Sequence, residues 1–169
     1  MSTVKTSKAM SSEEKLSKVQ YTAKTHTTGG REGGRSLSSD GCLDIRIERP
    51  GSSDGGTNPE QLFAAGWSGC FLSSIRHVAS GMKITVPDDV AIDAEVDLCK
   101  GDHGYFLQAR LNVSLPGLDR KTAQALIDET HKFCPYSRAT RGNIDVVINL
   151  VQPAFSLTRS SKSPVIESI

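Results

Sequence analysis

This 169-residue chain contains four cysteines, whose thiols could bind a metal or take part in redox chemistry. Cys70 closes the stretch GWSGC, Cys134 lies in HKFCPYSR, and Cys42 and Cys99 stand alone elsewhere. The chain has no C-x-x-C pair, and its four scattered histidines form no zinc-ligand cluster with the cysteines, so no metal site is expected. In a reducing compartment such cysteines are either buried apolar residues or redox-active thiols.

Cys70 belongs to a helix expected over residues 58–80, and two glycines precede it closely. Gly66 and Gly69 each cost about 1 kcal/mol relative to alanine inside a helix. They therefore indicate a bend or a close approach of another backbone. If a new helical segment begins at residues 67–68, Cys70 lies in its first turn, where free N–H groups lower a thiol pKa. The alternative is a buried cysteine in a glycine-notched core helix.

Cys134 lies at the end of a second predicted helix, directly before Pro135. A helix C-terminus does not favour a thiolate, so Cys134 is a poor attacking nucleophile but a suitable resolving cysteine. Proline stops the helix there, which predicts Cys134 at a boundary instead of in the core. The alternative is again a buried small residue. Cys42 and Cys99 show no activating neighbour in the sequence and are interpreted as structural.

Two arginines could supply a cation to a thiolate. Arg31 lies in GGREGG, a loop that its glycines are expected to make mobile. Arginine is always charged and offers a planar fork of donors, so beside Cys70 it would stabilise a thiolate. Arg35 competes for the same role, and a solvated turn residue is the alternative interpretation of Arg31.

Glu60 lies in the first turn of the Cys70 helix, where a negative charge suits the helix dipole. Ten residues of straight helix separate it from Cys70 by about 15 Å. For Glu60 to act with Cys70, the helix must bend, Arg31 must bridge the gap, or two chains must build the site.

The elements that position these residues follow from periodicity and turn signals. Alternating strands, amphipathic helices and glycine-rich turns give the order ββ-α-ββ-α-β, an α+β domain. The strands expected at 19–28 and 43–48 pair as one hairpin, and those at 90–98 and 105–115 pair as a second. A last strand is expected at 143–151. The helices are expected at 58–80 and 119–133. The domain is expected over residues 18–152, between disordered tails at 1–17 and 153–169.

Composition excludes several classes of function. Twenty basic and nineteen acidic residues leave a formal net charge of +1, which gives no footprint for nucleic acid or for an anionic membrane. No apolar run reaches the length of about 18 residues that a transmembrane helix needs, and no signal-peptide core follows Met1. The N-terminal segment is a poor mitochondrial presequence. A cytoplasmic protein is expected, with the mitochondrion as the weaker alternative.

Three segments in the right order resemble the organic hydroperoxide resistance (Ohr) proteins of the OsmC/Ohr family. They are TGGREG, then SSDGCLDIRI with TNPEQLFAAGWSGCF, and finally FCPYSRATRGNIDV. The resemblance covers residues 19–151.

This resemblance implies a thiol peroxidase without metal, haem or flavin, which reduces alkyl or fatty-acid hydroperoxides to alcohols. It assigns Cys70 as the peroxidatic thiolate and Cys134 as the cysteine that closes a disulfide with it. Arg31 and Glu60 match the residues that pair to hold the reduced site. The implied reductant is a dithiol, usually a lipoyl group (dihydrolipoamide) carried on a protein. The implied fold is an intertwined homodimer with the sites at its interface.

The sequence departs from the family pattern in three places and leaves alternatives open. Cys42 stands where valine is more usual, and the loops GGREGGR and PGSSDGG differ in length, which leaves Arg31 and Arg35 as competitors. Four apolar residues would suit an organic substrate or equally a core or interface: Leu62, Phe63, Trp67 and Phe71. The alternative functions are an OsmC-type stress-induced peroxidase and a non-catalytic dimeric binding protein.

Overall fold

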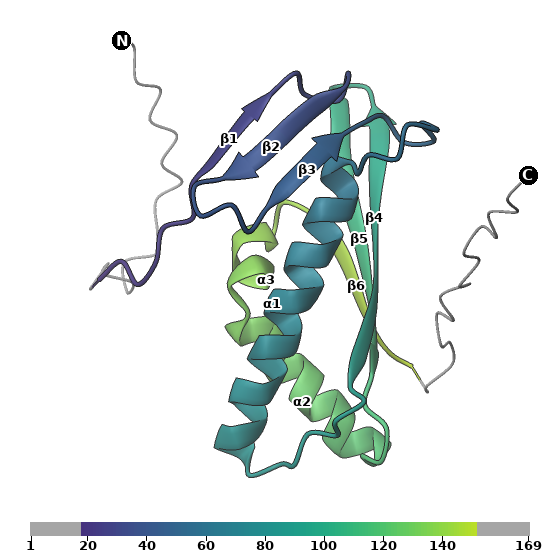
Figure 1. The fold of residues 1–169 in the computed structure, drawn as a ribbon. Coiled ribbons are helices and arrows are strands. Elements are labelled where there is room, and N and C mark those ends of the chain that lie inside the picture. The colour runs from purple at the N-terminus through teal and green to yellow at the C-terminus, as the bar shows by residue number, and fades with distance from the viewer. Residues whose placement is uncertain (1–17, 152–169) are drawn as a thin grey trace, which may run out of the picture. The chain divides into compact units, whose positions relative to one another are not determined.

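The computed structural model describes residues 18–151, which form two compact units that divide after Thr57. Each unit is described by itself (Figure 1). The tails expected at 1–17 and 153–169 lie outside the described residues, as does Gln152. No helix among the described residues is long and apolar enough to cross a membrane.

The first unit is an antiparallel sheet of three strands in the order β1-β2-β3. The strands are β1 (Thr25–Thr28), β2 (Gly34–Ser38) and β3 (Asp44–Ile47). The expected direct hairpin between the first and last of these strands is wrong, because β2 lies between them and pairs with both.

Strand β2 was missed because GGREGGR is a tight, ordered hairpin turn whose last two residues already belong to the strand. Gly29 has φ 70° and Gly33 has φ 87°, a region that glycine enters without strain. A Cβ on Gly34 would lie 2.4 Å from the carbonyl oxygens of Thr28 and Gly30. The glycines therefore serve close backbone approach and not mobility.

The second unit packs helices on a sheet with the order β4-β5-β6. Its strands β4 (Ala91–Gly101) and β5 (Gly104–Ser114) form the predicted antiparallel hairpin. Strand β6 (Asp145–Val151) pairs parallel to β5, so the connection between them crosses over through the helices α2 (Arg120–Phe133) and α3 (Pro135–Thr140).

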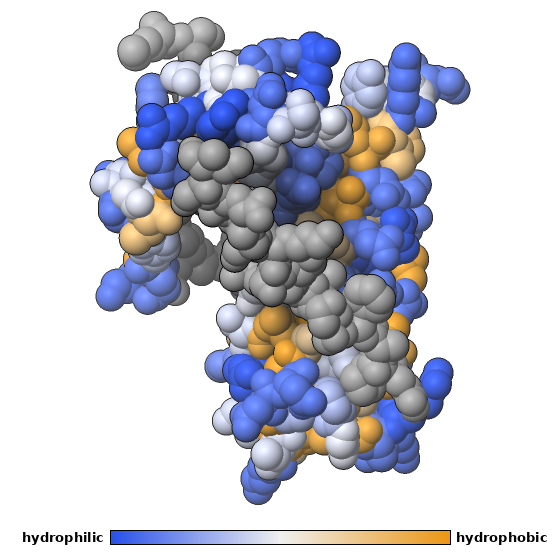
Figure 2. Space-filling view, turned by 45° about the vertical axis from the view of Figure 1, so that its right-hand side comes forward, coloured by the Kyte–Doolittle hydropathy of each residue, from blue (hydrophilic) through white to orange (hydrophobic). Residues whose placement is uncertain are grey.

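One face of this sheet and the helices enclose the core. Residues alternate along β5, where Ala109, Leu111 and Val113 are buried. They pack in one cluster with Trp67 and Phe71 of helix α1 (Pro59–Met82) and with residues of α2. Figure 2 shows hydrophobic residues, in orange, that still reach the surface among hydrophilic ones.

Helix α1 (Pro59–Met82) is one continuous helix of 24 residues, so no new helical segment begins at residues 67–68 after Gly66. Asn58 caps it through a hydrogen bond from the Gln61 N–H to Asn58 Oδ1 (2.9 Å), and proline occupies the first turn. Figure 1 shows α1 running through the second unit as a straight ribbon.

The order of elements is βββ-α-ββ-αα-β, and the expected α+β class is confirmed. Helix α2 ends at Phe133 as predicted and begins one residue later than predicted, at Arg120, with Asp119 as its N-cap. The additional helix α3 follows because Pro135 stops α2 and then opens a new helix as its first residue.

Candidate active site

The sulfur atoms of Cys70 and Cys134 lie 3.8 Å apart, although 64 residues separate them in the chain. Cys70 comes from the middle of α1, and Cys134 lies at the joint between α2 and α3. Both thiols are free. The fold thus brings together the two cysteines that the sequence singled out, at a distance from which a small movement joins them in a disulfide.

Cys134 is fully buried and packs in the core cluster. The expectation that it lies at a helix boundary holds, but the expectation that it therefore lies outside the core is wrong. The reason is that α1 packs against both α2 and α3, so the joint between α2 and α3, where Cys134 lies, faces Cys70 of α1.

Cys70 is half-buried and lies twelve residues into a continuous helix, so it is not in the first turn of a new segment. Burial raises the pKa of its thiol, the neighbouring Cys134 adds to that rise, and the backbone N–H of Tyr136 and the Ser74 side chain oppose it. The Ser74 hydroxyl also donates to the Cys70 carbonyl oxygen at 2.8 Å. Within the second unit alone, Cys70 therefore favours the protonated thiol.

The N–H group that donates to the Cys70 sulfur comes from α3, whereas it was expected from the helix that carries Cys70. Tyr136 is the second residue of α3, where backbone N–H groups have no partner inside the helix. The signal in the sequence was Pro135, because proline is common at the first position of a helix. The prediction made from Pro135 covered only the end of α2.

Phe63 and Trp67 of α1 pack in the same cluster as the two cysteines. The rings of Phe63 and Trp67 meet edge to face at 5.5 Å, and Phe63 also contacts the ring of Tyr136 at 5.9 Å. The Trp67 indole N–H donates to Ser137 Oγ at 3.3 Å. Trp67 and Phe71 are fully buried core residues, which leaves the half-buried Leu62 and Phe63 as the candidates to contact an organic substrate.

Arg31 and Arg35 both belong to the first unit, and the structure distinguishes them there. Arg35 makes two hydrogen bonds to Asp44, Nε to Oδ1 at 2.7 Å and Nη2 to Oδ2 at 2.6 Å. This contact lowers the pKa of the Asp44 carboxyl and occupies the fork of Arg35. Arg31 lies in the β1–β2 turn and lines a hollow with residues that include Arg46 and Glu48. Its role at the thiolate stays a prediction.

Glu60 is the second residue of α1 and does not reach Cys70 within the helix. Because α1 is continuous, the ten residues between them span about 15 Å. This removes the bent-helix route by which Glu60 was expected to act. A bridge through Arg31 and a site built by two chains remain as predictions.

The remaining two cysteines differ from each other. Cys42 is exposed in the β2–β3 connection, where its N–H donates to Asp40 Oδ1 at 3.0 Å. Cys99 is half-buried in β4, opposite Phe106 of β5. The exposure of Cys42 contradicts a packing role for its side chain.

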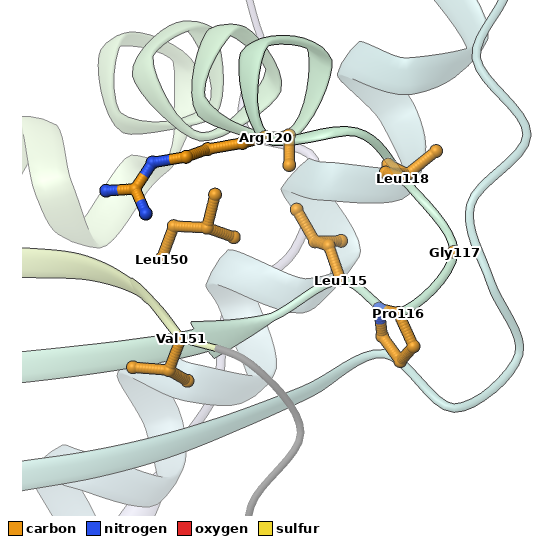
Figure 3. A pocket seen from close by; sticks show the side chains of 8 residues that line it. Leu115, Pro116, Gly117, Leu118, Arg120, Leu150 and Val151 are labelled. Carbon is orange, nitrogen blue, oxygen red and sulfur yellow. The ribbon is translucent and has the colours of Figure 1, made fainter.

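A separate apolar pocket opens beside the start of α2, and its lining contains no cysteine. Figure 3 shows Leu115 and Leu150 there below the side chain of Arg120. Among residues 18–151, no three potential metal-ligating side chains gather in one place. The chemistry that the described residues support therefore centres on Cys70 and Cys134.

The chain is similar to known proteins over most of its length. The family described as "OsmC-like protein" matches residues 51–149. An organic hydroperoxide resistance protein of Xanthomonas axonopodis pv. citri is 45% identical over 137 residues, which cover 79% of this chain and 96% of the relative. The organic hydroperoxide resistance protein OhrB of Bacillus subtilis is 44% identical over 135 residues, covering 77% of this chain and 97% of OhrB.

Solved structures agree with the sequence relatives. The crystal structure of Bacillus subtilis OhrB superposes with a TM-score of 0.74 at 43% identity, covering 79% of this chain and 100% of OhrB. A second solved structure comes from Psychrobacter arcticus and is described as a "putative osmotic stress induced and detoxification response protein". It gives a TM-score of 0.60 at 16% identity, covering 79% of this chain and 98% of that one. The second likeness concerns the fold alone.

Proposed function

Because the chain belongs to the OsmC/Ohr family, we propose that it is a thiol-dependent peroxidase that reduces organic hydroperoxides to alcohols. Cys70 is the peroxidatic residue and Cys134 the resolving residue of this reaction. The single observation that carries the proposal is the distance of 3.8 Å between the two sulfur atoms. The high identity to proteins named for organic hydroperoxide resistance supports the choice of substrate class.

The proposed cycle has three balanced steps. The Cys70 thiolate attacks the terminal peroxide oxygen, the O–O bond breaks, and the alkoxide leaves and takes a proton, which yields an alcohol and a Cys70 sulfenic acid. The Cys134 thiol then attacks the Cys70 sulfur, and water leaves as the disulfide forms. A dithiol reduces this disulfide by exchange and is itself oxidised to a cyclic disulfide.

The environment of Cys70 supports this division of roles. Cys70 is half-buried and within reach of solvent, whereas Cys134 is fully buried, so a hydroperoxide meets Cys70 first. The Tyr136 N–H stabilises negative charge on the Cys70 sulfur. Phe63 packs against the same core cluster as Cys70 and provides apolar surface, which favours an alkyl chain over hydrogen peroxide.

Arg31 supplies the cation that Cys70 needs in the proposed enzyme. Within the second unit, burial raises the Cys70 pKa, and an adjacent guanidinium would lower it again. Arg31 is proposed for this role because it matches the loop arginine of the family in TGGREG. Arg35 is bonded through two nitrogens to Asp44 in the first unit. Glu60 pairs with Arg31 and orients it.

A homodimer is the proposed assembly. The end of the β4–β5 hairpin leaves apolar side chains uncovered in the single chain, with Leu98 43%, Phe106 48% and Tyr105 70% exposed. Clusters of exposed apolar residues are typical of surfaces that another protein covers. A second copy would also allow Glu60 of one chain to approach Cys70 of the other.

The proposed reductant is a lipoyl dithiol such as dihydrolipoamide, carried on a protein. A cycle that ends in a disulfide requires a compartment that keeps dithiols reduced, for which the cytoplasm is the proposed location. The enzyme uses no other cofactor in this proposal.

Intact mass spectrometry tests the proposal directly. The reduced protein is treated with one equivalent of cumene hydroperoxide and its mass is measured under denaturing, thiol-blocking conditions. The expected result is the loss of two hydrogen atoms, mapped to a Cys70–Cys134 link, with one equivalent of alcohol released. An unchanged mass would show that the protein is not this peroxidase and would favour a non-catalytic binding protein.

Substrate comparison separates the Ohr-type from the OsmC-type alternative. Initial rates are measured with tert-butyl hydroperoxide and with hydrogen peroxide at equal concentration. An Ohr-type enzyme is expected to react faster with the organic peroxide. Equal rates, or a preference for hydrogen peroxide, would favour the OsmC type.

A further inference from the structure

We propose that Ser137 is a positioning residue that holds Cys134 against Cys70 through the indole of Trp67. The inference deepens the proposed function and rests on it, because it concerns how readily the Cys70–Cys134 disulfide closes. Ser137 does not touch the reacting sulfur atoms in this proposal. It acts through Trp67, and thereby through the contact between α3 and α1.

The hydrogen bond joins the two helices close to the cysteines on both sides. Trp67 lies three residues before Cys70 on α1, and Ser137 lies three residues after Cys134 on α3. The indole N–H donates to Ser137 Oγ at 3.3 Å, and both residues have no exposed surface. One helical turn separates each partner from its cysteine, so the bond sets the spacing of the segments that carry the sulfurs.

Helix α3 needs such a tether because its own backbone does not fix it. Cys134 has φ −56° and ψ 125°, which interrupts the helical geometry between α2 and α3. Helix α3 has six residues, too few to be stable as an isolated helix. Contacts with neighbouring helices therefore decide where α3 lies and where Cys134 points.

The Trp67–Ser137 pair is well suited to this task. The indole N–H is only a donor, and a buried donor without an acceptor is strongly disfavoured. Among the described residues, Ser137 Oγ is the acceptor recorded for this N–H. If α3 moves away from α1, the donor loses its acceptor, so the bond resists the motion that would separate Cys134 from Cys70.

Equilibrium thiol–disulfide exchange measures the effect without any hydroperoxide. Oxidised dithiothreitol takes two electrons and two protons from Cys70 and Cys134, which gives the protein disulfide and reduced dithiothreitol. The equilibrium constant of this exchange reports how well the fold presents the two thiols to each other. It is measured for the wild type and for Ser137→Ala, Ser137→Thr, Trp67→Phe and the double variant Trp67→Phe/Ser137→Ala.

The expected result is a loss of about tenfold in the equilibrium constant for Ser137→Ala, which corresponds to about 30 mV for a two-electron couple. Ser137→Thr keeps the hydroxyl and is expected to recover most of the loss. In the Trp67→Phe background the same Ser137→Ala change is expected to have little further effect, because the bond is already absent. Ser73→Ala, which removes an exposed hydroxyl on α1, is the matched control and should leave the constant unchanged.

Two outcomes would overturn the inference. One is an unchanged constant in a Ser137→Ala protein that folds, as judged by its urea unfolding transition. The other is an equal Ser137→Ala effect with and without Trp67, which would show that Ser137 does not act through the indole. Failure of the peroxidase proposal is separately visible, because the hydroperoxide assay would then fail in the wild type while the exchange constant still depended on Ser137.

Discussion

Gly66 of α1 and the ring of Tyr136 in α3 lie so close that a Cβ at position 66 would meet Tyr136 Oη at 2.8 Å. At Gly69, one turn further along α1, no atom of residues 18–151 outside the neighbouring helix backbone lies within 4 Å of the corresponding position. Two glycines that look alike in the sequence therefore have different reasons to be there. The first admits a neighbouring side chain, and no packing constraint accounts for the second.

This difference predicts that alanine affects stability differently at the two positions. Gly69→Ala is expected to stabilise the protein by about 1 kcal/mol, because alanine favours the helix more than glycine does. Gly66→Ala has the same propensity gain but must displace the ring of Tyr136, so it is expected to be neutral or destabilising. Urea unfolding of the reduced protein measures both, and equal stabilisation by the two variants would contradict the packing argument.

Replacing Cys70 and replacing Cys134 are expected to impair hydroperoxide reduction in different ways. Cys70→Ser should abolish hydroperoxide consumption, because it removes the attacking sulfur. Cys134→Ser should allow a single turnover and then leave a Cys70 sulfenic acid, which dimedone labelling with mass spectrometry detects. Cys99→Ser is the control and should keep multiple turnovers. Full activity of both Cys70→Ser and Cys134→Ser would exclude the proposed cycle.

The pH dependence of Cys70 alkylation tests the role of Arg31. The thiolate is the reactive form, and burial in the second unit raises the Cys70 pKa, so without a cation the reaction should require a higher pH. In the wild type we expect the midpoint of the rate profile below the value of about 8.5 of free cysteine. Arg31→Gln is expected to move the midpoint above that value.

Arg35→Gln is the matched control for this profile, because Arg35 is bonded to Asp44. Its midpoint should equal that of the wild type. A shift in Arg35→Gln without one in Arg31→Gln would reverse the assignment of the two arginines. Rates are followed with iodoacetamide and peptide mapping, so that Cys42 and Cys99 are counted separately.

The cap of α1 predicts a stability effect away from the cysteines. Asn58 Oδ1 accepts the Gln61 N–H at 2.9 Å. Asn58→Ala is expected to destabilise the protein by about 1 kcal/mol, and Asn58→Asp should keep most of the stability because its carboxylate caps equally well. Thermal unfolding of both variants is the measurement, and an unchanged midpoint in Asn58→Ala would show that the cap does not stabilise the native state.

Local patterns were sufficient for most of the elements. Alternation predicted β4, β5 and β6, and helical periodicity predicted α2, on which Ala123, Leu126 and Ile127 form the buried face. Strand β2 and helix α3 were missed for one reason. Gly34 and Pro135 can each mark the end of an element, and here each begins one.

The sequence by itself determined the α+β class, the family motifs and the two cysteines worth testing, because these depend on residue types and local spacing. Only the tertiary structure decided that α1 stays straight past its glycines, and that the N–H beside Cys70 comes from Tyr136. It also decided that Cys134 is buried within 3.8 Å of Cys70. These features depend on how α3 packs on α1 across more than sixty residues of chain, and a contact at such separation is set by packing that no local pattern contains.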